Sequence, residues 1–121
     1  MKLRILDDSI RLRLSQSEVG RIAQGEAVRS HTRFPHGSFL GYGLEPSTAT
    51  AIGATFLDNV ITVRVPAEAA RNWATTDQVA LTSSQPIEGG ELTVLVEKDF
   101  ECLEPRTGEE DQDAFPNPKA D

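Results

Sequence analysis

Long apolar runs, paired cysteines and catalytic signatures are all missing from this sequence. No apolar stretch approaches the roughly 18 residues that a membrane-spanning helix requires, and the charged first residues lack the apolar core of a signal peptide. The one cysteine, Cys102, excludes an internal disulfide framework, and its distance from the two histidines excludes zinc-finger spacing. We therefore expect a reduced, cytoplasmic, soluble protein.

Motifs that would indicate an enzyme are missing as well. There is no phosphate-binding loop, no dinucleotide-binding glycine fingerprint and no nucleophile elbow. Cys102 with His31 or His36 would supply a nucleophile and a base, but nothing in the sequence brings them together. We expect no enzymatic activity and no cofactor.

What is present fits one small domain. The chain has 121 residues, of which 38% are hydrophobic and only 6% aromatic, enough for a modest core. Residues 1–104 are expected to form this domain. Residues 105–121 are acidic, contain three prolines and have little to bury, so they are expected to form an extended arm, with Phe115 anchoring it to its own domain.

The charge is unevenly distributed along the chain. The net charge is −7, yet residues 1–38 hold seven Lys and Arg against four acidic residues. The first third is therefore mildly basic and the last third strongly acidic. This asymmetry marks either a face for an anionic partner or two charged surfaces that partly neutralise each other.

The first half of the chain predicts two hairpins around a short helix. Residues 2–6 and 10–14 alternate apolar with charged side chains, and a turn at 7–9 puts their apolar residues on one face. Ser15 and Glu18 form a capping box that begins a helix, which Gly25 ends. Strands at 28–34 and 38–45 then surround a turn. Gly41 and Gly43 leave one face of the second strand bare, for close packing or for a ligand.

The second half predicts the same order of elements. Strands at 51–57 and 60–65 flank a tight turn, Pro66 falls in the first turn of the next helix, and Trp73 lies on the buried stripe of that helix. Strands at 78–84 and 91–100 form the last hairpin, around a loop at 85–90.

The two halves form an internal repeat. A shift of 51 positions aligns residues 2–28 with 53–79 without a gap, and apolar positions fall on apolar positions. Units at about 1–45 and 50–100 would each read ββαββ, and neither buries enough surface to be stable alone. We therefore predict an α+β, mainly β fold, in which pseudo-two-fold duplicated ββαββ units form a small barrel or sandwich with two short helices.

Part of the second unit resembles a known module. Val65-Pro66, Glu68, Trp73, Asp77 and Val79 resemble the AbrB/MazE-type swapped-hairpin barrels, although Thr76 stands where that family has glycine. The resemblance implies a small barrel and, since many such modules bind DNA, a nucleic-acid-binding regulator as one alternative.

A second resemblance covers nearly the whole chain. It rests on four segments, which are MKLRILDDSIRLRLSQSEV, the Trp73 segment, VEKDFECL and EEDQDAFPNP. These segments together are similar to a small bacterial family of unknown function. The resemblance implies that the acidic arm belongs to the protein, but it implies no activity.

Two sets of candidate site residues remain. A candidate face for an anion or a partner consists of Arg4, Arg11, Arg13 and Arg64, together with Arg29 and Arg33. The net charge of −7 disfavours nucleic acid as the ligand of this face. Asp99 and Cys102 are a weak candidate metal or ligand site, whose mixed oxygen and sulfur donors select no particular metal.

These patterns favour a binding or interaction module over an enzyme. The expected ligand is an unidentified protein partner or small molecule, and the chain is expected to be a monomer or homodimer that does not bind membranes. A nucleic-acid-binding regulator is the first alternative, and a small metal- or metabolite-binding protein is the second.

Overall fold

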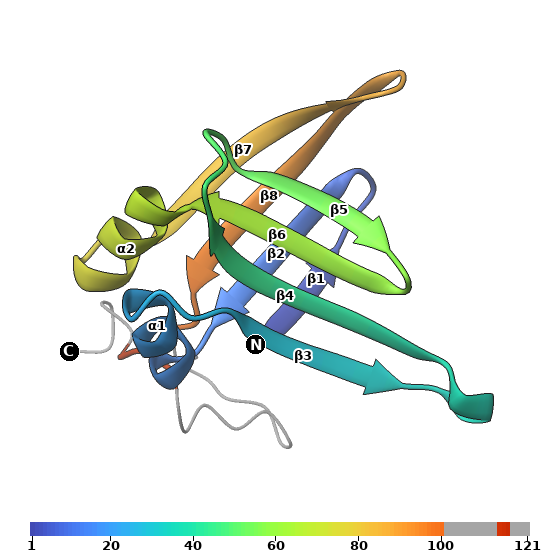
Figure 1. Ribbon diagram of the computed structural model, residues 1–121, viewed down its shortest axis with the longest axis horizontal. Helices are drawn as coiled ribbons and strands as arrows, with labels where there is room; N and C mark the ends of the chain where they lie inside the picture. The colour runs from blue at the N-terminus through green and yellow to red at the C-terminus, as the bar shows by residue number, and fades with distance from the viewer. Residues whose placement is uncertain (101–113, 117–121) are drawn as a thin grey trace.

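The computed structural model describes residues 1–100 and 114–116, which form eight strands and two short helices (Figure 1). The first half contains β1 (Lys2–Ile5), β2 (Ser9–Leu14), α1 (Gln16–Ala23), β3 (Val28–Arg33) and β4 (Phe39–Ser47). The second half contains β5 (Gly53–Leu57), β6 (Val60–Pro66), α2 (Ala67–Thr75), β7 (Ala80–Ile87) and β8 (Gly90–Lys98). A single 3-10 turn, η1 (Pro35–Gly37), joins β3 to β4.

The strands form two four-stranded sheets, and each sheet takes one hairpin from each half of the chain. Sheet A has the order β1-β2-β8-β7, and sheet B has the order β3-β4-β6-β5. The central pairs, β2 with β8 and β4 with β6, are parallel, whereas the strands of each hairpin are antiparallel. The predicted pseudo-two-fold duplication is therefore confirmed, with the hairpins of the two halves exchanged between the sheets.

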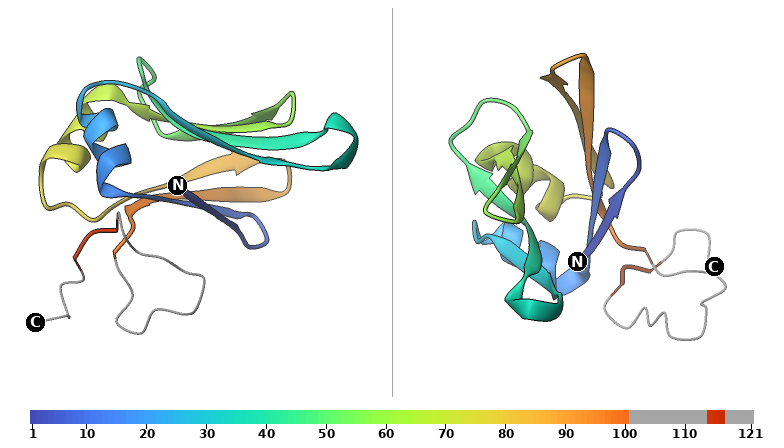
Figure 2. Two further views of the ribbon diagram at one scale, coloured as in Figure 1. Left: turned by 90° about the horizontal axis from the view of Figure 1, so that it is seen from below. Right: turned by 90° about the vertical axis from the view of Figure 1, so that its right-hand side faces the viewer.

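The arrangement is a sandwich and not a closed barrel. The sheets lie over one another, and α1 and α2 pack together across one end (Figure 2). Within the described chain, β1, β7, β3 and β5 remain edge strands, because neither sheet is joined to the other along its edges. The closed barrel implied by the AbrB/MazE resemblance is thus not formed. None of the described helices is long and apolar enough to cross a membrane.

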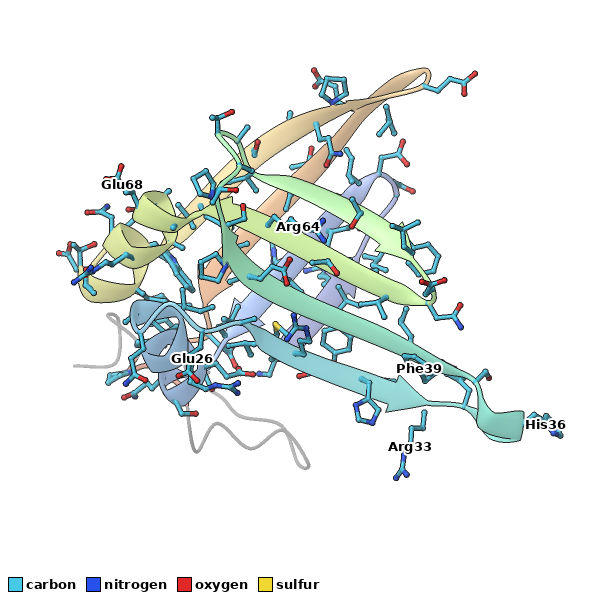
Figure 3. All side chains as sticks on the ribbon, in the orientation of Figure 1. Glu26, Arg33, His36, Phe39, Arg64 and Glu68 are labelled. Carbon is cyan, nitrogen blue, oxygen red and sulfur yellow. The ribbon has the colours of Figure 1, made fainter. Side chains whose placement is uncertain are left out.

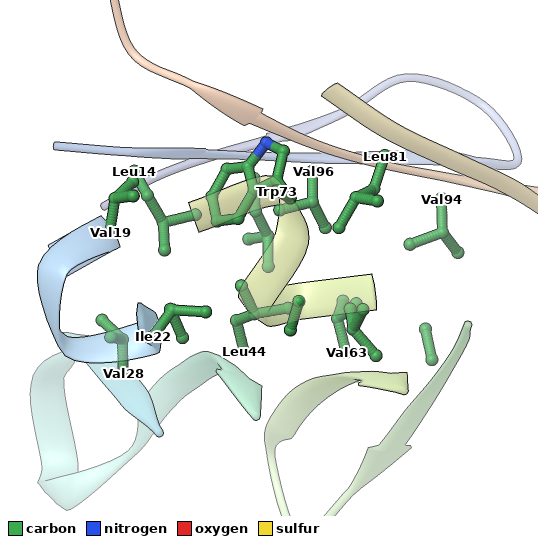
Figure 4. Packing of buried hydrophobic residues seen from close by; sticks show 14 residues of the cluster. Leu14, Val19, Ile22, Val28, Leu44, Val63, Trp73, Leu81, Val94 and Val96 are labelled. Carbon is green, nitrogen blue, oxygen red and sulfur yellow. The ribbon is translucent and has the colours of Figure 1, made fainter. Parts of the chain in front are cut away.

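The core lies between the inner faces of the sheets and the two helices (Figure 4). Its centre is Trp73, which is fully buried and whose indole Nε1 donates a hydrogen bond to the Val79 carbonyl over 2.9 Å. The strand residues that alternate inward complete the core, namely Leu12, Leu14, Val28, Leu44, Val63, Val65, Val94 and Val96. The period-2 pattern of the sequence therefore identifies the buried face correctly.

Local signals fix the helix ends largely as expected. The Glu18 amide donates to Ser15 Oγ, and the Ser15 amide donates to Glu18 Oε1 at 3.0 Å, which confirms the capping box. Gly25 follows α1 with a φ of 83°, as a C-terminal glycine should. Pro66 is the residue before α2 and not a member of its first turn, so it occupies the same capping position as Ser15.

The structure differs from the sequence-based prediction in strand length. β7 continues through Pro86 to Ile87, and β8 begins at Gly90, so much of the loop expected at 85–90 is paired strand. β4 likewise runs past Pro46, which the sequence placed in a break. Proline is tolerated at both positions because tertiary pairing with a neighbouring strand overrides its low strand propensity.

The shift of 51 positions aligns equivalent residues of the two halves through the helices, but not in the strands that follow. Val28, paired by sequence with Val79, is buried in β3, whereas Val79 is 45% exposed and precedes β7. Leu81 takes the equivalent buried place, opposite Val96, as Val28 lies opposite Leu44. The second half has two more residues between the last buried residue of its helix, Trp73, and the first buried residue of the following strand, Leu81, and a gapless comparison cannot register them.

Residues 114–116 lie against the domain. The Phe115 amide donates to the Asp99 carbonyl over 2.7 Å, and the Phe115 and Phe100 ring centroids are 5.9 Å apart. Gln16 Nε2 also donates to the Ala114 carbonyl over 2.9 Å. The expectation that Phe115 anchors this segment in cis is confirmed for these three residues, while the rest of the expected arm lies outside the described residues.

Candidate binding surface at the hairpin end

The turns of all four hairpins lie at one end of the sandwich, opposite α1 and α2, and we call this the hairpin end (Figure 1, Figure 2). The tight turns there require left-handed backbone, and Asp7, His36, Asp58 and Asn59 adopt positive φ in them. Short polar side chains and glycine tolerate this conformation, so the sequence places hairpin turns at these points.

Exposed apolar side chains concentrate at the hairpin end. Of the eight large hydrophobic residues that are exposed in the described chain, seven flank these turns: Ile5, Leu6, Phe34, Phe39, Phe56, Leu57 and Ile87. The eighth, Val79, lies near the end of α2. Exposed apolar side chains that gather in one region typically mark an interaction site, whereas single ones need no explanation.

A cavity of about 330 Å³ opens between the two sheets at this end. Sheet A contributes Ile5 and Ile10, and sheet B contributes Leu40, Phe56 and Ile61. The helices close the opposite end of the sandwich, so this cavity is where the core meets solvent. Its walls are almost wholly apolar, which suits an apolar group and not a charged one.

A larger pocket, of about 490 Å³, lies at the β3–β4 hairpin. It is lined by the aromatic residues Phe34, Phe39 and Tyr42 and by three basic ones. Phe39 shares the face of the sheet with the basic side chains, whereas Tyr42 packs against the core. The basic residues are Arg29, His31 and Arg33, which alternate along the edge strand β3. Figure 3 shows Arg33, His36 and Phe39 at or near the tip of this hairpin.

The two glycines of β4, Gly41 and Gly43, occupy their positions for different structural reasons. A Cβ at Gly43 would stand 2.9 Å from the Val28 carbonyl oxygen, so close packing of β3 against β4 requires glycine there. A Cβ at Gly41 would meet side chains and not backbone, Val60 at 3.1 Å and Phe39 at 3.5 Å, and Gly41 also lines the β3–β4 pocket. The face of β4 that the sequence predicts to be without side chains therefore packs closely against β3 at Gly43 and lines the pocket at Gly41.

The four arginines of the candidate anion face do not share one surface. Arg4, Arg11 and Arg13 lie in sheet A, while Arg64 lies in sheet B. Arg13 Nε contacts Glu97 Oε1 at 2.8 Å, and Arg64 Nε contacts Glu45 Oε1 at 2.9 Å.

These two ion pairs are equivalent under the pseudo-two-fold, because each crosses a central parallel strand pair at the same register position. Each glutamate contacts a second arginine as well: Arg11 Nε lies 3.5 Å from Glu97 Oε1, and Arg29 Nη2 lies 3.0 Å from Glu45 Oε2. A phosphate group would have to compete with these carboxylates for the guanidinium groups.

Of the weak metal candidate, only Asp99 lies among the described residues. Its carboxylate is mostly buried and contacts Lys2 Nζ at 3.0 Å. Cys102 lies outside the described residues. In the part of the chain that the structure describes, no three His, Cys, Asp or Glu side chains lie together as a metal site would require.

Lys98 is the unusual buried cation of the fold. It is the last residue of β8 and faces inward, where its Nζ donates to the Thr76 carbonyl at the end of α2 over 2.6 Å. The same Nζ lies 5.8 Å from the Trp73 ring centroid and 5.7 Å from that of Phe115. Burial lowers the pKa of Lys98, and the Asp77 carboxylate partly opposes this shift.

This pKa shift predicts a pH dependence of stability. Between the lowered pKa and 10.5, the unfolded state binds more protons at Lys98 than the folded state does, so the free energy of unfolding rises with pH in that window. We expect the difference in stability between the parent chain and Lys98→Met to grow in favour of the parent as pH approaches 10.5. Urea unfolding of both proteins at several pH values measures it, and a constant or shrinking difference would contradict it.

Sequence reasoning missed the apolar residues of the hairpin end. Phe34 and Phe39 flank the turn at 35–38, and Phe56 and Leu57 precede the turn at 58–59. Large apolar side chains next to polar turn residues were the available signal, since hairpin tips are ordinarily solvated. Arg29 and Arg33 belong to the anion face that the sequence predicts. Their position next to Phe39 and Gly41 depends on the register between β3 and β4, which the sequence does not show.

Fold and surface together define a two-sheet β-sandwich that is closed by helices at one end and carries apolar pockets at the other. The chain belongs to DUF7009, a family of unknown function, whose model matches residues 1–119. No curated protein and no solved structure matches the chain.

Proposed function

We propose that this protein is a non-enzymatic, cytoplasmic binding module that takes a partner protein at its hairpin end. The observation that carries the proposal is that, of the eight large apolar side chains exposed in residues 1–100 and 114–116, seven gather at that end, beside two pockets. A partner would cover apolar surface that the fold leaves in water, and such burial contributes about 25 cal/mol per Å² to association before its entropic costs.

The test compares two sets of exposed apolar substitutions. We expect Phe34→Ser with Phe39→Ser to lower at least tenfold the recovery of a specific partner from lysate of the cells that express the protein. Val79→Ser is the matched control, because Val79 is also exposed but lies near the helices. Quantitative mass spectrometry of the captured proteins measures recovery, and circular dichroism verifies that each variant folds.

Three results would count against this proposal. Equal recovery by the double variant and the control would show that the hairpin end is not the interface. Sedimentation of the purified chain as a dimer that the double variant abolishes would make the partner a second copy. DNA retention at about 50 mM salt that Arg13→Glu abolishes would favour the nucleic-acid-binding alternative instead.

A further inference from the structure

We propose that the β3–β4 pocket binds an extended, acidic peptide segment of the partner protein, with one apolar side chain of that segment packed against Phe39 and Val60. This inference rests on the proposed function, and it names the ligand class and the place on the hairpin end. Charge, shape and strand geometry each support it.

The charge of the pocket is opposite to that of the whole protein. No Asp or Glu among the described residues lines the pocket, although the chain carries a net charge of −7. Arg29, His31 and Arg33 form a basic row along β3. Arg29 shares Glu45, whereas Arg33 has no ion-pair partner within the described residues and is exposed. A carboxylate beside Arg33 would therefore gain a charge-assisted contact without displacing another one.

The shape of the pocket suits one apolar side chain beside these charges. In the register of the hairpin, Arg33 lies opposite Phe39, and His31 lies opposite Gly41. Gly41 itself is buried, because the side chains of Phe39 and of Val60, in the neighbouring strand β6, lie within 3.5 and 3.1 Å of the place where a Cβ would stand. These two side chains form an apolar surface next to the basic residues, and an aromatic or aliphatic side chain packed on it would bury apolar surface of Phe39, which is 41% exposed.

Strand geometry explains why the segment should be extended. β3 is an edge strand of sheet B, so the backbone on its outer side is available to another strand. In an extended peptide, every second side chain lies on the same face, as the basic row does along β3. A segment whose successive residues on that face are acidic, apolar and acidic would thus place its carboxylates beside Arg29 and Arg33 and its apolar side chain between them, towards Phe39 and Val60.

A synthetic peptide provides the direct test. The probe is the amidated heptapeptide TETFTET with fluorescein on its N-terminus, in which Glu, Phe and Glu share one face when it is extended, titrated with the full chain and followed by fluorescence anisotropy. We expect saturable binding that weakens with added salt, because the contacts are partly exposed ion pairs. We expect Arg33→Glu to weaken binding about tenfold or more, since it places a carboxylate where the peptide needs a cation.

Matched controls separate the site from general charge effects. Arg71→Glu makes the same change of charge on an exposed arginine of α2, far from the pocket, and should leave binding unchanged. The peptide TKTFTKT keeps the aromatic side chain with the charge reversed, and TETGTET removes the aromatic side chain. Both should bind at least tenfold more weakly than TETFTET. Thermal unfolding verifies that the two glutamate variants remain folded.

The outcomes distinguish this inference from the proposed function. No binding of TETFTET at about 1 mM, or equal effects of Arg33→Glu and Arg71→Glu, overturns the acidic-peptide assignment. Binding of 4-phenylbutyrate with the same sensitivity to Arg33→Glu, but no binding of the peptide, also overturns it, in favour of a small-molecule site. If the peptide fails while partner capture still depends on Phe34 and Phe39, the binding module stands and only the ligand class is wrong.

Discussion

Replacing Trp73 with alanine is expected to lower the free energy of unfolding by about 3–5 kcal/mol. Trp73 is fully buried where α2 meets both sheets, so its removal leaves a cavity that the surrounding strands cannot close without losing their register. The change also removes the donor to the Val79 carbonyl and the ring beside Lys98. Domains of this size have total stabilities of about 5–15 kcal/mol, so the loss would be a large part of the whole.

Urea unfolding followed by circular dichroism measures this effect, because Trp73 is the only tryptophan and its fluorescence is lost with it. Trp73→Phe is the control, since it keeps most of the apolar volume and should cost clearly less than alanine. A loss below about 1 kcal/mol for Trp73→Ala would mean that the two sheets do not depend on this side chain.

Gly43→Ala is expected to destabilise the fold by about 1–3 kcal/mol, although alanine is ordinarily the better residue in regular structure. The new Cβ would stand 2.9 Å from the Val28 carbonyl oxygen and 3.1 Å from Arg29 Cγ. The carbonyl is backbone, so relief requires β3 to move relative to β4. The same urea titration, compared with the parent chain, measures the cost.

Gly20→Ala provides the matched control. Gly20 lies inside α1, and a Cβ there would have no neighbour within 4 Å. The substitution should therefore stabilise the protein by about 0.5–1 kcal/mol, since glycine is unfavourable inside a helix. If both Gly43→Ala and Gly20→Ala stabilised the protein, the close packing of β3 on β4 would be contradicted. A loss of stability for Gly43→Ala with a gain for Gly20→Ala would support it.

Much of the fold could be predicted from local patterns. Alternation identified the inward residues of β2 and β6, such as Leu12 and Val63, because side chains of a strand point to opposite faces in turn. The capping box of Ser15 and Glu18 located the start of α1. The order ββαββ repeated in both halves predicted the pseudo-two-fold.

The candidate site was much less predictable. Arg13 and Arg64 were grouped because both alternate outward, yet they lie in different sheets and each contacts a glutamate from the other half of the chain. Which strands become neighbours depends on non-local pairing, and the sequence carries no local signal of it. The same holds for the basic row of β3, which meets Phe39 and Gly41 only through the hairpin register.

The sequence by itself determined the elements, their inward faces, the turns and the duplication, because these depend on neighbours within a few residues. Tertiary structure alone decided that the halves exchange hairpins, that the sheets form a sandwich and that the apolar turn residues gather at one end. The physical reason is that each half buries too little apolar surface alone, so its hairpins pair with those of the other half. The helices then close one end of the shared core, and the hairpin end is left open to a ligand.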